Sequence, residues 1–202
     1  MSPRRYQMAN RSTAVEETRR RIVEAAVRLH ARRGTAGTAW DDIAVAAGVS
    51  RATVYHHFPS LDELVPACAR AAFDMIEVPT REEAAARFAE LGTPSARLAH
   101  FIRESCRCYA AGAGWLRAAW RERDLVPPMG AAVKRLQRAL SVLLSGALEG
   151  VALDPQGLEV VAALVDFPLW DALDRAGVPR DRIAGRISKL AEFEIKTRSS
   201  RR

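Results

Sequence analysis

Hydrogen-bond donors and small methyl groups are concentrated between residues 50 and 57, where the sequence reads SRATVYHH. Arg51 carries a planar guanidinium that can donate two parallel hydrogen bonds to O6 and N7 of guanine. Ala52 and Thr53 carry methyl groups of the kind that contact the thymine methyl. The remaining polar residues carry groups that suit phosphate oxygens, which fix register without reading sequence: Ser50, Tyr55, His56 and His57. This chemistry fits the edges and the backbone of duplex DNA.

Two short helices are predicted to position these side chains. Thr38 followed by Asp41 is typical of the capped start of a helix, and Gly48 then supplies a tight turn. Ser50 can cap the second helix. Two short helices joined by a glycine-containing turn form a helix-turn-helix unit, whose second helix is shaped for the major groove. Thr38 and Trp40, at the start of the first helix, are further candidates for DNA contacts.

From about Thr18 to Cys68 the chain resembles the TetR (tetracycline repressor-like) family of bacterial transcription regulators. The resemblance rests on RRRIVEAAVRLHARRG, DDIAVAAGVSRATVYHHF and PSLDELV, residues 19–34, 41–58 and 59–65. It implies a three-helix DNA-binding domain over 1–59 and a helical regulatory and dimerisation domain over 60–202. It also implies a homodimer that binds a palindromic operator, most simply as a repressor that responds to a small-molecule effector. Tyr55 is assigned to a phosphate by the same resemblance.

Charge and composition agree with one modest cytoplasmic protein. The net charge is +7, and residues 1–60 hold ten Lys/Arg against five Asp/Glu, so positive charge is denser around the predicted DNA-reading segment. Apolar residues make up 49% of the chain, which is ample for a core. No apolar run approaches the ~18 residues of a membrane span, and the three cysteines form no disulfide framework. Residues 1–14 are predicted to be a flexible arm.

Helix caps and breakers recur along the remainder of the chain, so the predicted fold class is all-α. A first helix is expected from about Val15 to Arg33, and a fourth over 60–77. The last two, over about 155–176 and 179–195, are apolar on more than one side, which indicates burial on more than one side. Either they are internal core helices of a monomer or they form a four-helix bundle shared by two subunits. The resemblance favours the shared bundle.

Aromatic residues mark the middle of the chain, residues 79–150. In a helical bundle they could line an apolar cavity for a small, largely apolar effector, and four are selected as candidates: Phe101, Tyr109, Trp115 and Trp120. Ordinary core packing is the alternative for each of them. A DNA-binding or structural protein without a ligand is the corresponding alternative function.

Metal, redox and enzymatic chemistry find little support. Cys106 and Cys108, with His100, could suggest a metal or redox sensor. Residues two apart on a helix point about 200° apart, however, so the two thiols cannot easily share one tetrahedral ion. Neither a phosphate-binding glycine loop nor a nucleophile elbow is present in the sequence. No enzyme activity, cofactor or metal is therefore expected.

Overall fold

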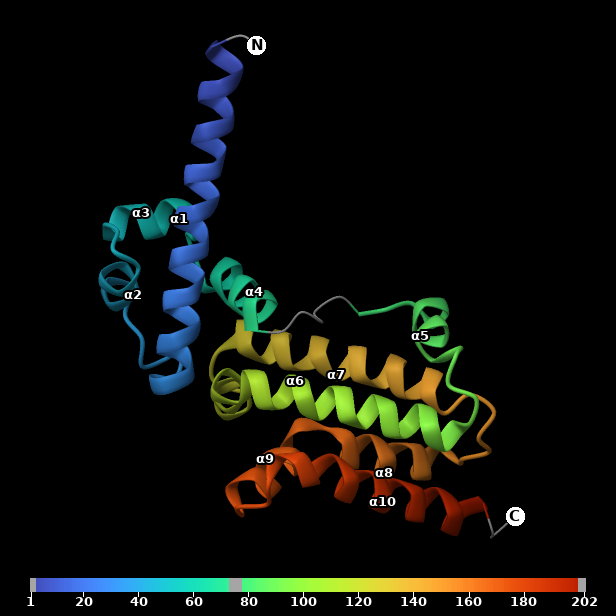
Figure 1. The fold of residues 1–202 in the computed structure, drawn as a ribbon. Coiled ribbons are helices and arrows are strands. Elements are labelled where there is room, and N and C mark those ends of the chain that lie inside the picture. The colour runs from blue at the N-terminus through green and yellow to red at the C-terminus, as the bar shows by residue number, and fades with distance from the viewer. Residues whose placement is uncertain (1–2, 73–77, 200–202) are drawn as a thin grey trace. The chain divides into compact units, whose positions relative to one another are not determined.

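The computed structural model describes residues 3–72 and 78–199, and every regular element within these residues is a helix (Figure 1). The predicted all-α class is confirmed. The helices are α1 (Pro3–Arg33), α2 (Trp40–Ala47), α3 (Arg51–His57), α4 (Leu61–Ala72), α5 (Arg81–Phe88), α6 (Pro94–Glu122), α7 (Pro127–Ala147), α8 (Pro155–Val165), α9 (Phe167–Arg175) and α10 (Arg180–Ser199). Within these two ranges, no helix combines the length and the apolar character that crossing a membrane requires.

The chain divides into two compact units. The first combines residues 1–74 with 117–133, and the second combines 75–116 with 134–202. The first unit therefore holds α4, the end of α6 and the start of α7 in addition to the predicted helix-turn-helix segment. Helices α6 and α7 each contribute to both units.

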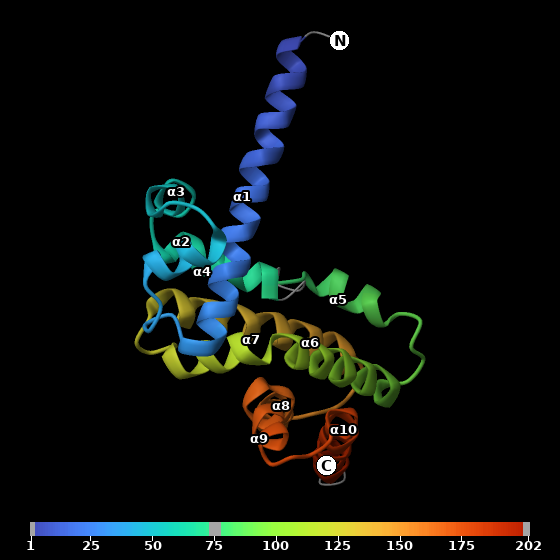
Figure 2. The ribbon, with the colours of Figure 1, turned by 60° about the vertical axis from the view of Figure 1, so that its left-hand side comes forward.

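In the first unit, α1 packs against both α2 and α4, and α2 packs against α3 (Figure 2). Ile22, Ala26 and Leu29 recur on one face of α1 and are buried, as the sequence periodicity predicts. Val54 from α3 and Leu64 from α4 are fully buried in the same unit. These contacts fix α3 through its inner face and leave its outer face exposed.

Helix α1 begins earlier than the sequence analysis predicted. It starts at Pro3 rather than near Val15, so residues 3–14, the expected flexible arm, are helical in the structure. Proline is compatible with the first turn of a helix, where its missing N–H costs nothing. Between Pro3 and Gly34 neither glycine nor proline interrupts the helix. Residues 1 and 2 lie outside the described residues, as does the predicted end of the fourth helix over 73–77.

In the second unit, α8 packs against α10 (Figure 1). The predicted single helix over 155–176 is wrong, because it breaks at Asp166 into α8 and α9. Asp166 is extended and its carboxylate accepts from the backbone N–H of Phe167 at 2.8 Å, while Pro168 occupies the first turn of α9. The carbonyl of Val165, the last residue of α8, accepts a buried hydrogen bond from the Tyr109 hydroxyl at 2.9 Å.

Candidate nucleic-acid interface

The start of α3 is fixed by its N-terminal cap. The Ser50 hydroxyl accepts from the backbone N–H of Thr53 at 3.1 Å, which confirms the predicted cap. Gly48 ends α2 in the left-handed region, at φ +65°, where glycine is favoured. Val54 is buried, whereas Arg51 and Ala52 are exposed and Thr53 is half-exposed. The first turn of α3 therefore faces outward. It carries both kinds of predicted base contact, the guanidinium of Arg51 and the methyl groups of Ala52 and Thr53.

The Arg51 side chain makes contacts with residues of both α2 and α3. Its Nη1 donates to Asp41 Oδ2 at 3.1 Å, and its Nη2 donates to the Tyr55 hydroxyl at 3.4 Å. The guanidinium also lies over the Tyr55 ring, 5.5 Å from its centroid. Trp40 also packs against Tyr55, with the two ring centroids 4.9 Å apart. The structure therefore brings Trp40, Arg51 and Tyr55 into one cluster on the exposed side of α2 and α3.

The two histidines at the end of α3 differ in their surroundings. His56 is exposed, and His57 is half-buried. The His57 carbonyl accepts from Arg19 Nη1 at 3.1 Å, and the guanidinium of Arg19 lies over the Phe58 ring, 4.2 Å from its centroid. Burial, with the neighbouring His56 and Arg19, lowers the pKa of His57. The His56 side chain is therefore open to solvent, while His57 is partly enclosed beside α1.

Thr38 does not cap α2, so that prediction is wrong. Its hydroxyl instead donates to the carbonyl of Gly34 at 2.6 Å, within the turn after α1. The residue before α2 is Ala39, and the carboxylate of Asp42 accepts from its backbone N–H at 3.4 Å. Trp40 is consequently the first residue of α2, half-exposed at the end that carries free backbone N–H groups.

A buried carboxylate from α6 holds the turn between α1 and α2. Glu122 is 5% exposed, and its Oε2 accepts from the backbone N–H groups of Thr35 at 2.7 Å and Ala36 at 3.3 Å. Its Oε1 accepts from Arg121 at 3.1 Å. Gly34, at φ +82°, makes room, because a Cβ there would lie 1.7 Å from Glu122 Oε1. We call this group the Glu122 clamp. The sequence analysis missed it, because Glu122 and Thr35 lie 87 residues apart.

His30 is buried near the clamp without a hydrogen bond to either ring nitrogen from the described part of the chain. Burial lowers the pKa of His30 from 6.5 to about 4, although the negative charge of Glu122 acts in the opposite direction. The imidazole is therefore neutral at pH 7 and behaves as an apolar core side chain.

This pKa predicts an acid-labile first unit. As the pH falls from about 6.5 to 4, the unfolded chain takes up a proton that folded His30 refuses, so the free energy of unfolding falls. The loss from this residue is expected to be on the order of 3 kcal/mol. Denaturant titrations across this pH range measure it. His30→Phe should flatten the dependence and His56→Gln, at an exposed histidine, should leave it unchanged. If the free energy of unfolding of His30→Phe still fell with pH as steeply as that of the wild type, His30 would not be the cause.

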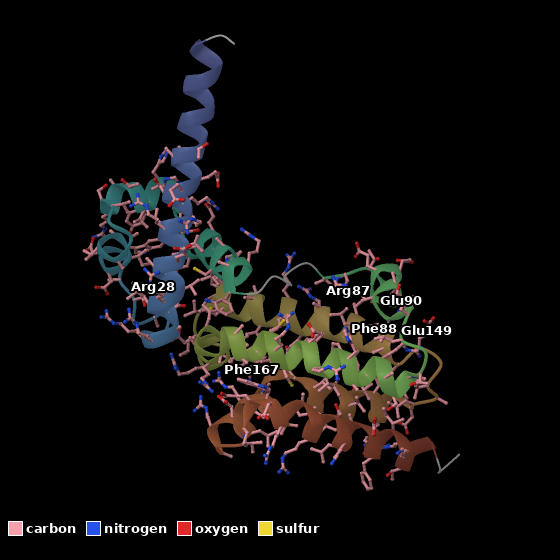
Figure 3. All side chains as sticks on the ribbon, in the orientation of Figure 1. Arg28, Arg87, Phe88, Glu90, Glu149 and Phe167 are labelled. Atoms are coloured by element: carbon pink, nitrogen blue, oxygen red, sulfur yellow. The ribbon has the colours of Figure 1, made fainter. Side chains whose placement is uncertain are left out.

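Among the four residues predicted to line an effector site, Phe101 lies at a cavity that the described residues form. Phe101 lines a cavity of about 350 Å³ between α5, α6 and α7, together with Phe88, His100 and Leu143. Arg87 and Phe88 are the residues that α5 contributes to it (Figure 3). Phe88 and His100 meet edge to face, with ring centroids 6.3 Å apart. This cavity has an apolar floor and a rim of polar side chains.

Tyr109, Trp115 and Trp120 lie elsewhere. Tyr109 is 2% exposed, and its hydroxyl donates a hydrogen bond to the carbonyl of Val165. The centroids of the Phe167 and Trp170 rings lie 5.6 Å and 6.1 Å from that of the Tyr109 ring. Burial raises the pKa of Tyr109, so its hydroxyl keeps its proton. Trp115 is 4% exposed in the second unit, whereas Trp120 belongs to the first unit. Tyr109 packs as a core residue at the α8–α9 break.

The cysteines have the surroundings of core residues. Cys106 is buried, Cys108 is half-buried, and neither forms a disulfide. Burial raises the pKa of Cys106 to about 12, so its thiol is protonated at neutral pH and a poor metal ligand. Across the described ranges, no three His, Cys, Asp or Glu side chains come together in a way that could hold a metal ion.

Comparison with known proteins agrees with this geometry. The family model described as bacterial regulatory proteins of the tetR family matches residues 22–68. Over 52 residues, 26% of this chain, the sequence is 50% identical to the HTH-type transcriptional regulator TtgR of Pseudomonas putida. A tetR-family regulator of Streptomyces coelicolor superposes with a TM-score of 0.67 and 24% identity, covering 93% of this chain and 84% of that one. Residues 22–68 therefore carry the sequence signature of the tetR family, and the chain has the fold of a tetR-family regulator.

The sequence match and the likeness of fold extend over different lengths of this chain. The match to TtgR spans a quarter of the length of that relative. The family match over residues 22–68 includes every DNA-contact candidate. The likeness of fold extends through the helices beyond it. The multidrug binding protein EbrR, solved with ethidium, has a TM-score of 0.59 and 20% identity, covering 88% of this chain and 97% of that one. At this identity the likeness shows the fold alone.

Proposed function

We propose that this chain is a transcription repressor that binds a palindromic DNA operator as a homodimer and releases it when a small molecule binds. The observation that carries the proposal is the outer face of α3, where Arg51 and Ala52 are exposed on a helix fixed by the Ser50 cap. An α-helix fits the major groove, in which each base pair presents its own pattern of donors and acceptors. The surplus of positive charge in residues 1–60 supports attraction to phosphates.

The homodimer is supported by apolar side chains that this chain leaves exposed. Leu158 on α8 is 38% exposed, and Leu190 and Phe193 on α10 are 48% and 70% exposed. By contrast, Val165 and Ile187 are buried within the subunit itself. We assign the dimer contact to the Leu158, Leu190 and Phe193 side of α8 and α10. A dimer sets two reading helices about 34 Å apart, which matches successive major grooves.

The effector half of the proposal rests on the cavity between α5, α6 and α7. Its floor of Phe88, Phe101 and Leu143 is buried, and its volume of about 350 Å³ suits a small aromatic or apolar molecule. A thermal-shift screen that includes ethidium, followed by operator titration with each hit, tests it. We expect a hit to weaken operator binding and to lose its effect in Phe101→Trp, which fills the cavity. Hits that stabilise the protein yet leave operator binding unchanged would contradict effector control.

Base recognition by Arg51 provides the test of DNA binding. An operator is first selected from a random duplex library with the wild-type protein. Arg51→Ala is then expected to cost ~1–3 kcal/mol on that operator and little on unrelated DNA, because a guanine-reading fork is lost. Fluorescence anisotropy at one fixed salt concentration measures both affinities. Equal losses on the two duplexes would show that Arg51 contacts only phosphate.

A further inference from the structure

Asp41 and Arg51 come from the first turns of two different helices and meet on the exposed side of the helix-turn-helix unit. Asp41 Oδ2 accepts from Arg51 Nη1 at 3.1 Å, and the two side chains are 64% and 57% exposed. The Tyr55 hydroxyl accepts from the other terminal nitrogen, Nη2, at 3.4 Å. The guanidinium is therefore held by one hydrogen bond from each of its terminal nitrogens before DNA is present.

A guanidinium carries five N–H donors in a fixed plane. Asp41 and Tyr55 each take one, so three remain for the edge of a base. A long side chain that is already oriented loses less conformational freedom when it binds than a mobile one does. The Asp41 carboxylate has a second effect, because an exposed negative charge on this surface repels phosphates of any sequence.

We propose that Asp41 is a positioning residue that raises the sequence specificity of Arg51. It does so by orienting the guanidinium for guanine, while its negative charge lowers the affinity for DNA of any sequence without changing the ratio. The inference depends on the proposed DNA-binding function and assigns specificity to a residue of α2, outside the helix that enters the groove.

The experiment compares Asp41→Asn, Asp41→Glu and Asp62→Asn with the wild-type protein on the selected operator and on an unrelated duplex. Asp62 is a matched control, because it is an exposed acid in the first turn of α4. Asp41→Asn is expected to reduce the ratio of operator to unrelated-DNA affinity about two- to fivefold, with tighter binding to unrelated DNA. Asp41→Glu keeps the carboxylate and should recover most of the ratio. Asp62→Asn should tighten both complexes equally.

A second comparison separates positioning from simple charge repulsion. In an Arg51→Ala background, Asp41→Asn should no longer change the ratio, since there is no guanidinium left to orient. Equal tightening on both duplexes by Asp41→Asn would overturn the proposal, because Asp41 would then only repel phosphate or sequester Arg51. Failure of the wild-type protein to select any duplex would instead reject the proposed function. Circular dichroism of each variant confirms that the helices are intact.

Discussion

The double substitution Leu190→Glu, Phe193→Glu is expected to convert the proposed dimer to monomers and to weaken operator binding by about two orders of magnitude. Both side chains are exposed on α10, so their replacement leaves the core of the subunit intact. In a dimer contact the new carboxylates would lose their hydration without gaining partners. A monomer then engages only one half-site, and the gain from joining two binding events is lost.

Sedimentation velocity at micromolar concentration and operator titration measure the two effects. Leu125→Glu is the matched control, because Leu125 is 77% exposed and lies between α6 and α7 rather than on α10. It should leave both the oligomeric state and the melting temperature close to those of the wild type. A Leu190→Glu, Phe193→Glu variant that still sediments as a dimer would place the contact on another surface.

Replacing Gly34 by alanine is expected to reduce the free energy of unfolding by about 2–5 kcal/mol. At φ +82° a side chain strains the backbone, by ~1–2 kcal/mol. The new Cβ would also displace the Glu122 carboxylate from its two backbone donors, and a buried N–H left without an acceptor costs ~1–3 kcal/mol. Chemical denaturation measures the sum.

Gly150 separates these two contributions. It has the same φ of +82°, but a Cβ there meets no atom within 4 Å, so Gly150→Ala reports the backbone strain alone. In a Glu122→Ala background the carboxylate is gone, and the remaining neighbour of the new Cβ, Arg121 Nη2 at 2.8 Å, is the end of an exposed side chain that can move away. Gly34→Ala should then cost no more than Gly150→Ala does. A Gly34→Ala loss that is unchanged by Glu122→Ala would mean that the clamp plays no part.

Local sequence signals predicted the elements well where one short segment decides the outcome. The predicted Ser50 cap is present, and α5 begins with a reciprocal cap between Thr80 and Glu83; each needs only residues three apart. The cap at Thr38 failed, because the helix starts after Ala39 and Thr38 is used by the preceding turn. Two competing local hydrogen bonds decide that position, and the sequence pattern shows only one of them.

The break at Asp166 had a readable signal that periodicity concealed. Apolar residues continue at helical spacing from Leu158 through Ala172, and this pattern predicted one helix. Asp166 followed by Pro168 is nevertheless a start signal, since aspartate caps helices and proline favours the first turn. The structure follows the start signal. A hydrophobic stripe alone does not decide whether a helix is continuous.

The candidate site also contains residues that local sequence signals predict and residues that they do not. The exposure of Arg51 and Ala52 follows from the periodicity of α3, so both could be predicted from the sequence as candidate DNA contacts. The Glu122 clamp joins residues that lie far apart in the sequence, and no pattern near Thr35 indicates it. Tyr109 was assigned to a cavity, yet its hydroxyl reaches the Val165 carbonyl, which is free only because α8 breaks there. An aromatic residue in a sequence does not reveal which polar group its hydroxyl meets.

The Glu122 clamp also determines which chain segments must be exchanged together when a chimera of this protein and a second parent is made. Residues 117–133 belong to the same compact unit as the helix-turn-helix, although they follow it by more than forty residues. A chimera that exchanges the head at residue 59 alone would supply Gly34 and Thr35 from one parent and Glu122 from the other. Unless the second parent has a carboxylate at that position, the grafted turn loses its acceptor. An exchangeable reading head therefore consists of two separate chain segments, and sensor engineering with this scaffold should transplant both together.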